Sequence, residues 1–313
     1  MSVQAAQQVL LSDTGSGHEP RGPVAFARDV ARRPAGALAA AIILLLVLVA
    51  IFAPLIAPAN PDAINVTNTL ASPSARHLLG TDSLGRDNLS RVIFGTRVAL
   101  EVALPSVLGA FIAGSVLGMA AGYFGGVVDK VLVIAFDAVI SFPAVILGLA
   151  LLSLIGPSIQ SVVFVIALSL VPYYGRLIRA QTLSERKNQY VKAERSLGAS
   201  RARVLRRHIL PNVLAALLVV VAMDIPSAVI IEAGLAFLGL GVQPPTPDWG
   251  VILNDGFVNI GTSPWEILGP IVALVIMTTA FTVLGETMRD VLDPRQQPPR
   301  RGFLGRRLRD LDG

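Results

Sequence analysis

The chain has 313 residues, of which 53% are hydrophobic and only 15% charged, with a formal net charge of +5 and no cysteine. Soluble domains are rarely this apolar, and the missing cysteine excludes a disulfide framework and thiol chemistry. The basic residues fall in loops between apolar runs, which fits the orientation of a membrane protein better than a nucleic-acid-binding patch.

Six apolar runs are long enough to cross a bilayer, which takes about 20 residues of helix. They predict an all-α, polytopic membrane protein. Arg32 and Arg33 directly precede the first run, so we expect the N-terminal tail, residues 1–33, in the cytoplasm. Six crossings return the basic tail, residues 295–313, to the same side of a membrane domain at 34–294. The predicted spans are approximately residues 37–56, 99–122, 131–154, 159–177, 213–240 and 267–284.

Residues 57–98 form a polar segment that we expect outside the cell. It carries four arginines, although basic residues normally gather on the cytoplasmic side. The bias still points inward, because ten Lys and Arg lie between residues 176 and 207 and seven follow residue 288. We therefore predict an ordered segment in which the arginines pair with Asp82, Asp87 and Glu101, and an amphipathic helix from Leu84. The four arginines are Arg76, Arg86, Arg91 and Arg97.

Small residues mark the second span. Gly114, Gly118 and Gly122 repeat every fourth residue, which makes a flat strip for close helix packing in a membrane. Lining of a translocation pathway is the alternative, and packing is favoured. In the third span, Asp137 and Pro143 interrupt the apolar run.

A basic loop, residues 181–212, follows the fourth span. Its apolar positions recur at helical spacing, and Gly198 and Ala199 break the middle. This pattern predicts two short helices joined by a turn, with Pro211 near the start of the next helix. A solvated cytoplasmic loop and a helix lying on anionic lipid are the alternatives.

Two carboxylates lie in the fifth apolar run, on either side of Pro226, which should kink the helix. Asp224 is the deeper, and Glu232 lies nearer the outer mouth. Carboxylates at membrane depth usually face a bundle interior or water, so both are candidates for a translocation pathway. Pairing with a neighbouring helix or subunit is the alternative. Residues 241–266 are then expected as a rigid outer loop, with Trp249 at the membrane interface.

No motif for an enzyme active site is present. A nucleotide-binding loop needs a lysine after glycine, and none of the three lysines, Lys130, Lys187 and Lys192, follows one. The three histidines are scattered, which argues against a metal cluster or a catalytic triad. We therefore expect a non-catalytic membrane subunit without a metal or cofactor, one that depends on a gradient or on a partner.

The basic loop resembles the EAA loop of permease subunits of ATP-binding-cassette (ABC) importers, E-A-A-x3-G-x9-I-x-L-P. Aligned on Gly198, the chain keeps Leu210 and Pro211 and has His208 in place of the isoleucine. The E-A-A positions are occupied by Lys192, Ala193 and Glu194.

The rest of the chain is similar to the C-type permease of dipeptide, oligopeptide and nickel importers, from about residue 34 to 294. Four stretches carry the likeness: HLLGTDSLGRDNLSRVIFGTR (77–97), AGYFGGVVD (121–129), RHILPN (207–212) and FLGLGVQPPTPDWG (237–250). The outer-loop signature comprises His77, Gly80, Thr81, Asp82, Gly85, Arg86, Asp87, Ser90, Arg91 and Arg97.

The resemblance implies the MetI-like fold of type I ABC importers and a permease subunit in the bacterial inner membrane. It implies a second permease, two ATPase subunits that bind ATP and Mg²⁺, and an extracytoplasmic substrate-binding protein. Peptides are the first choice of substrate, and nickel or a nickel chelate is the alternative. A gradient-driven transporter or a channel subunit would show an inverted repeat or a repeated pore element, and neither is apparent. The residues implied to couple to the ATPase are Ala193, Glu194, Leu197, Gly198, Ala199 and Pro211.

Overall fold

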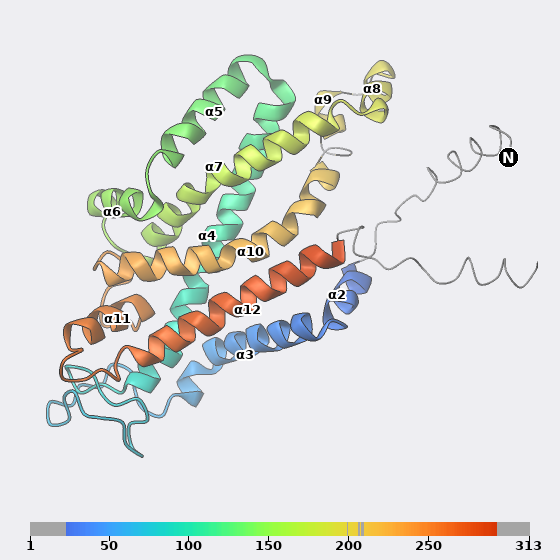
Figure 1. Cartoon of the computed structure of the whole chain (residues 1–313). Helices are drawn as coiled ribbons and strands as arrows, with labels where there is room; N and C mark the ends of the chain where they lie inside the picture. The colour runs from blue at the N-terminus through green and yellow to red at the C-terminus, as the bar shows by residue number, and fades with distance from the viewer. Residues whose placement is uncertain (1–22, 199, 206, 208–209, 293–313) are drawn as a thin grey trace, which may run out of the picture.

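The structure is a computed structural model that describes residues 23–292 except 199, 206, 208 and 209. The described chain is helical, and an isolated bridge between Thr81 and Asp87 is its single β-type pairing. The helices, labelled in Figure 1, are α2 (Pro23–Ala31), α3 (Pro34–Ile56), α4 (Asn88–Phe124), α5 (Gly126–Ile140), α6 (Ala144–Ile155), α7 (Ile159–Glu185), α8 (Gln189–Ser196), α9 (Arg201–Val204), α10 (Leu210–Phe237), α11 (Trp249–Val258) and α12 (Leu268–Leu292).

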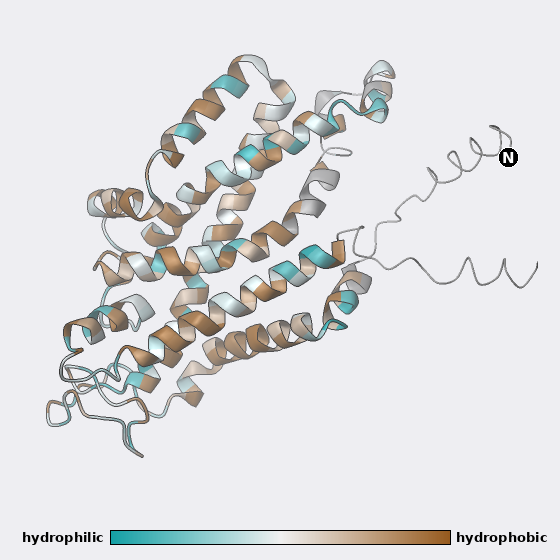
Figure 2. Cartoon of the chain, in the orientation of Figure 1, coloured by the Kyte–Doolittle hydropathy of each residue, from teal (hydrophilic) through white to brown (hydrophobic). Residues whose placement is uncertain are grey.

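Five helices are long and apolar enough to cross a membrane: α3, α4, α7, α10 and α12. In Figure 2 the colour of apolar residues is nearly continuous along α3, as expected for a helix in contact with lipid. A sixth crossing is formed only if α5 and α6 are taken together, and these two helices are bent by 91°. The predicted third span, residues 131–154, is therefore broken into two helices at residues 141–143. Pro143 explains the break, since proline disfavours helical geometry in the residue before it.

Helix α4 lies at the centre and contacts α3, α5, α7, α10, α11 and α12. Its glycine strip packs on the backbone of α7, which confirms the packing prediction. A Cβ atom added at Gly114, Gly118 or Gly122 would lie 2.9, 2.4 or 2.8 Å from the carbonyl oxygens of Val171, Gly175 and Arg179, respectively. The strip is covered by α7 and does not line a pathway.

The two ends of the molecule differ in structure (Figure 1). One end, here the α11 end, carries residues 57–87 and α11. The predicted helix from Leu84 was wrong, because α4 begins at Asn88, after turns in which Gly80 and Gly85 have φ of +69° and +73°. Residues 241–266 were predicted as a loop, yet they contain α11, which Asp248 caps.

The opposite end, the basic-loop end, carries α8 and α9 (Figure 1). The prediction of two short helices is confirmed, and Gly198 at the turn between them has φ of +84°. Helix α10 begins at Leu210, so Pro211 lies in its first turn as expected. Residues 23–31 of the predicted N-terminal tail form α2, which packs against α3 and α12.

Candidate functional site

The basic loop is anchored by buried valines and exposes a leucine. Val191 in α8 and Val204 in α9 are both buried in the hydrophobic core. Leu197 follows α8 and is 85% exposed, beside Gly198 at the turn. Because an exposed leucine gains free energy only when a partner covers it, the tip of the loop has the character of a contact surface.

The start of the basic loop is fixed to α4. Arg186 follows the last residue of α7, and its guanidinium donates hydrogen bonds to the carbonyl oxygens of Gly122 (2.9 Å) and Tyr123 (3.3 Å). Glu185 accepts a hydrogen bond of 2.6 Å from the Tyr190 hydroxyl, which holds the start of α8. Of the other predicted coupling residues, Ala193 is exposed, Glu194 is half-buried and Ala199 lies outside the described residues.

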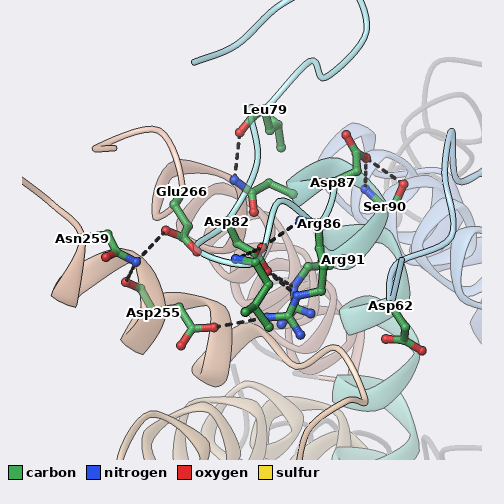
Figure 3. A network of polar contacts seen from close by, with 12 residues as sticks. Asp62, Leu79, Asp82, Arg86, Asp87, Ser90, Arg91, Asp255, Asn259 and Glu266 are labelled. Carbon is green, nitrogen blue, oxygen red and sulfur yellow. Dashed lines mark hydrogen bonds and ion pairs between the residues drawn. The ribbon is translucent and has the colours of Figure 1, made fainter. Parts of the chain in front are cut away.

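Buried ion pairs order the α11 end, as Figure 3 shows. Asp82 accepts a hydrogen bond of 2.5 Å from Arg86 Nε and lies 3.5 Å from Arg91 Nε. All three side chains are almost fully buried, so the Asp82 carboxylate, rather than water, provides the nearest opposite charge for both guanidinium groups. The predicted pairing of Asp82 with arginines is confirmed.

Asp87 has a different role from the predicted one. Its carboxylate accepts hydrogen bonds from the backbone N–H and the hydroxyl of Ser90, at 2.8 and 2.7 Å, and so caps α4. Its other oxygen lies 2.9 Å from His77 Nδ1. The expected Asp87–arginine pair was therefore wrong. Within the part of the chain that the structure describes, neither Arg97 nor Glu101 forms an ion pair, although both were expected to.

The signature residues before α4 build a compact turn. The Thr81 hydroxyl donates to the carbonyl of Asn68 and accepts from the N–H of Ala71 at 2.9 Å. Gly80 and Gly85 allow close backbone approach, since an added Cβ would lie 2.4 Å from Ala71 O and 1.9 Å from Asn65 O, respectively. The signature therefore encodes an ordered structure around the start of α4.

Acidic residues that the sequence analysis missed extend this network to α11 (Figure 3). Asp255 lies 3.9 Å from Arg86, and Glu266 accepts a hydrogen bond of 3.4 Å from Asn259. Burial raises the pKa of the Asp255 carboxyl, against the opposing effect of Arg91 and Arg86. Burial also raises the pKa of Glu266 to about 7.

A buried carboxyl pair joins α10 to the start of α11. Asp248 caps α11 by accepting hydrogen bonds from the N–H groups of Gly250 and Val251 at 2.7 and 3.4 Å. Glu232 lies against Asp248 and is 1% exposed, and burial raises the pKa of Asp248. The structure therefore places Glu232 in a pair with a neighbouring element of its own chain. An aspartate directly before an apolar Trp-Gly-Val-Ile run is an N-cap signal that could have revealed α11 and Asp248.

Trp249 locks α11 onto α4. Its indole N–H donates a hydrogen bond of 2.9 Å to Val92 O, and its ring covers Gly95, where an added Cβ would lie 2.5 Å from the indole. Trp249 was expected at the membrane interface, but it is 1% exposed and buried in the protein.

Asp224 is not part of this network. It lies midway along α10, half-buried, with Tyr173 and Tyr174 of α7 as its polar neighbours. One of its carboxylate oxygens is buried without a hydrogen-bond partner in the described chain. The structure therefore separates the two predicted pathway carboxylates, Asp224 beside Tyr174 and Glu232 at the α11 end. Among the described residues, no group of three or more His, Asp and Glu side chains could hold a metal ion.

Known proteins are similar to this chain in sequence and in fold. The family described as "binding-protein-dependent transport system inner membrane component" matches residues 114–298, and the "N-terminal TM domain of oligopeptide transport permease C" matches residues 26–73. A dipeptide transport system permease protein DppC of Alkalihalophilus pseudofirmus is 38% identical, over 80% of this chain and 83% of the relative.

Two relatives from Escherichia coli K12 have different named substrates. The probable D,D-dipeptide transport system permease protein DdpC is 37% identical over 84% of this chain and 88% of its own length. The nickel transport system permease protein NikC is 39% identical over 82% of this chain and 93% of its own length. A chain of the MetNI methionine ABC transporter, solved in inward-facing conformations, has a TM-score of 0.51, 17% identity, and coverage of 65% of this chain and 97% of that one.

The structural likeness confirms the expected fold, that of an all-α permease of a type I ABC importer. The sequence likeness extends over most of the membrane-spanning region and over most of each relative's own length. The chain belongs to the family of inner membrane components of binding-protein-dependent transport systems.

Proposed function

We propose that this chain is a permease subunit of an ATP-driven importer and that its basic loop is the contact for an ATPase subunit. The observation that carries the proposal is Leu197, 85% exposed at a turn between two short helices whose valines are buried. The chain has no nucleotide-binding motif of its own, so ATP and Mg²⁺ are bound by the ATPase subunits and this subunit is non-catalytic.

The charge distribution supports an orientation with the basic-loop end in the cytoplasm. Ten Lys and Arg lie between residues 176 and 207, whereas two of the four arginines of the other end, Arg86 and Arg91, are buried against Asp82. Paired and buried arginines do not act as orienting charges in the way that exposed ones do. The α11 end then faces outward, where a substrate-binding protein docks, and both termini are cytoplasmic.

A second permease completes the pathway, and a peptide is the proposed substrate. Two relatives, DppC and DdpC, are named for dipeptide and D,D-dipeptide transport, respectively. Nickel, alone or chelated, is the second candidate, because NikC is 39% identical over a similar length.

Reconstitution tests the proposal directly. The chain is purified with its partner permease, its ATPase subunits and its binding protein, and uptake into proteoliposomes is measured with labelled dipeptide or with Ni²⁺. We expect dipeptide uptake that requires ATP, and uncoupled ATP hydrolysis in Gly198→Trp, which places a bulky side chain at the turn. Uptake driven by an ion gradient without ATP would overturn the proposal, and ATP-dependent uptake of Ni²⁺ alone would select the second candidate.

A further inference from the structure

The break between α5 and α6 interrupts the helical hydrogen bonding within an apolar region. Ser141, Phe142 and Pro143 are all exposed, and the chain turns by 91° there. Ser141 follows the first residue of α5 by 15 positions, about 22 Å along a helix. The end of one helix and the start of another leave backbone N–H and C=O groups without helical partners. Lipid cannot satisfy such groups, so this face lines water or protein.

An ion pair lies on the same face, one helical turn from Ser141. Asp137 of α5 pairs with Arg176 of α7, and the two side chains are 53% and 48% exposed. Phe136 fixes the two helices beside the pair, because an added Cβ at Gly175 would lie 2.4 Å from its ring. A charged pair turned toward lipid would be costly, which again indicates an aqueous or protein surface.

A second α5–α7 ion pair provides a contrast. Arg179 donates a hydrogen bond of 2.7 Å to Asp129 in a two-point contact, and these side chains are only 31% and 21% exposed. This pair holds the start of α5 against α7. Asp137 and Arg176 carry the same chemistry but remain accessible, so they are free to exchange partners.

A further polar group adjoins the accessible pair. Tyr173 is half-exposed and lies one turn before Arg176 on α7, so the two side chains share a face. The Asp224 carboxyl of α10 lies instead beside the hydroxyl of Tyr174, which is fully buried. Helices α5 and α7 thus place one cation, one carboxylate and a phenol hydroxyl together on an accessible face.

We propose that Asp137, Arg176 and Tyr173 form a site within the translocation pathway that binds the charged termini of a short zwitterionic peptide. This inference rests on the proposed function and names the substrate groups that its pathway recognises. Arg176 exchanges the Asp137 carboxylate for the peptide carboxylate, which a guanidinium binds in two-point fashion. Asp137 takes the peptide ammonium, with Tyr173 as a further hydrogen-bonding group.

The balance of charges favours a zwitterion over a bare cation. A cation would have to bind beside the Arg176 guanidinium, which repels it. A zwitterion replaces one ion pair by two and leaves no charge unpaired. Because the Asp137–Arg176 pair must open first, binding is weak, as suits a site that a solute must leave.

Cysteine labelling tests the site, because the chain has no cysteine of its own. Ser141→Cys is introduced into the complex in proteoliposomes and treated with a membrane-impermeant maleimide, with labelling read on this subunit. Leu45→Cys is the control for a lipid-facing position, since Leu45 is exposed on the apolar helix α3. We expect Ser141→Cys to label at least about tenfold faster than Leu45→Cys.

Protection by peptide tests the ligand. The complex is assembled without its binding protein, so the selectivity of that protein does not enter, and dipeptide is added at millimolar concentration. Dipeptide should slow labelling of Ser141→Cys about threefold or more, whereas the same dipeptide with an acetylated amine and an amidated carboxyl should not. Arg176→Gln should abolish this protection, and Arg176→Lys and the matched control Arg179→Gln should retain it.

Three results would overturn the site. They are Ser141→Cys labelling as slowly as Leu45→Cys, equal protection by free and blocked dipeptide, and full protection in Arg176→Gln. These three labelling results test the site and not the proposed function. Failure of the proposed function would be seen in a different assay, as a lack of ATP-dependent uptake by the wild-type complex.

Discussion

Leu197 offers a quantitative test of how the permease engages its ATPase. Its side chain is 85% exposed in the chain alone, so nearly all of its apolar surface is available to a partner. Leu197→Ala removes three carbon groups, and at about 0.8 kcal/mol per buried CH₂ the loss is about 2 kcal/mol, or roughly 30-fold in affinity. The fold itself should be unaffected, because the leucine contributes little to the core.

The measurement is the affinity of the purified ATPase subunit for the permease pair in nanodiscs. Leu154→Ala is the matched control, since Leu154 in α6 is 82% exposed and undergoes the same chemical change away from the basic loop. We expect a weakened complex and reduced uptake for Leu197→Ala alone. Equal affinities for wild type and Leu197→Ala would refute the burial of this leucine against the ATPase.

Three other variants test the described contacts. Gly118→Ala should lower the free energy of unfolding by about 1–3 kcal/mol, because its Cβ would lie 2.4 Å from Gly175 O. The control Gly109→Ala should be tolerated, because the nearest neighbouring atom to its Cβ would lie 3.8 Å away. Similar melting temperatures for the two variants would contradict this packing. Asp87→Ala should cost about 1 kcal/mol through the lost cap of α4, and Asp87→Asn should recover part of it; full stability of Asp87→Ala would indicate a solvated segment. Burial raises the pKa of Glu266 from 4.5 to about 7, so the folded state favours the neutral carboxyl, and stability is highest below pH 4.5, falls as the pH rises to 7 and then stays level. Glu266→Gln should remove this fall in melting temperatures measured across the pH range. An unchanged fall would exclude Glu266 as its cause.

Patterns that depend on one helix at a time were predictable from the sequence. The apolar runs gave the positions of five crossings, since length and apolarity alone decide whether a helix can span a bilayer. The spacing of Gly114, Gly118 and Gly122 predicted close packing, and Gly198 predicted the turn between α8 and α9. In each case the physical cause lies within a few neighbouring residues.

Features that depend on two elements were not predictable in the same way. Hydropathy does not distinguish a straight span from two helices bent at Pro143, because both are equally apolar. Several arginines lie near Asp87 in the sequence, but in the structure its carboxylate caps α4 through Ser90 and contacts His77 instead. Glu232 meets Asp248 only because α11 folds back onto α10, and the helix α11 itself was not foreseen.

The glycine contacts between α4 and α7 also restrict how the subunit can move. Three glycine positions on α4 lie under three successive carbonyls of α7, spaced by four residues on each helix. The nearest equivalent register is one such step away, about 6 Å, so the two helices cannot slide past each other in smaller increments. They therefore travel as one rigid body, and Arg186 ties the start of the basic loop to it through Gly122. Rearrangement within the subunit must then occur between this pair of helices and the elements that pack around it.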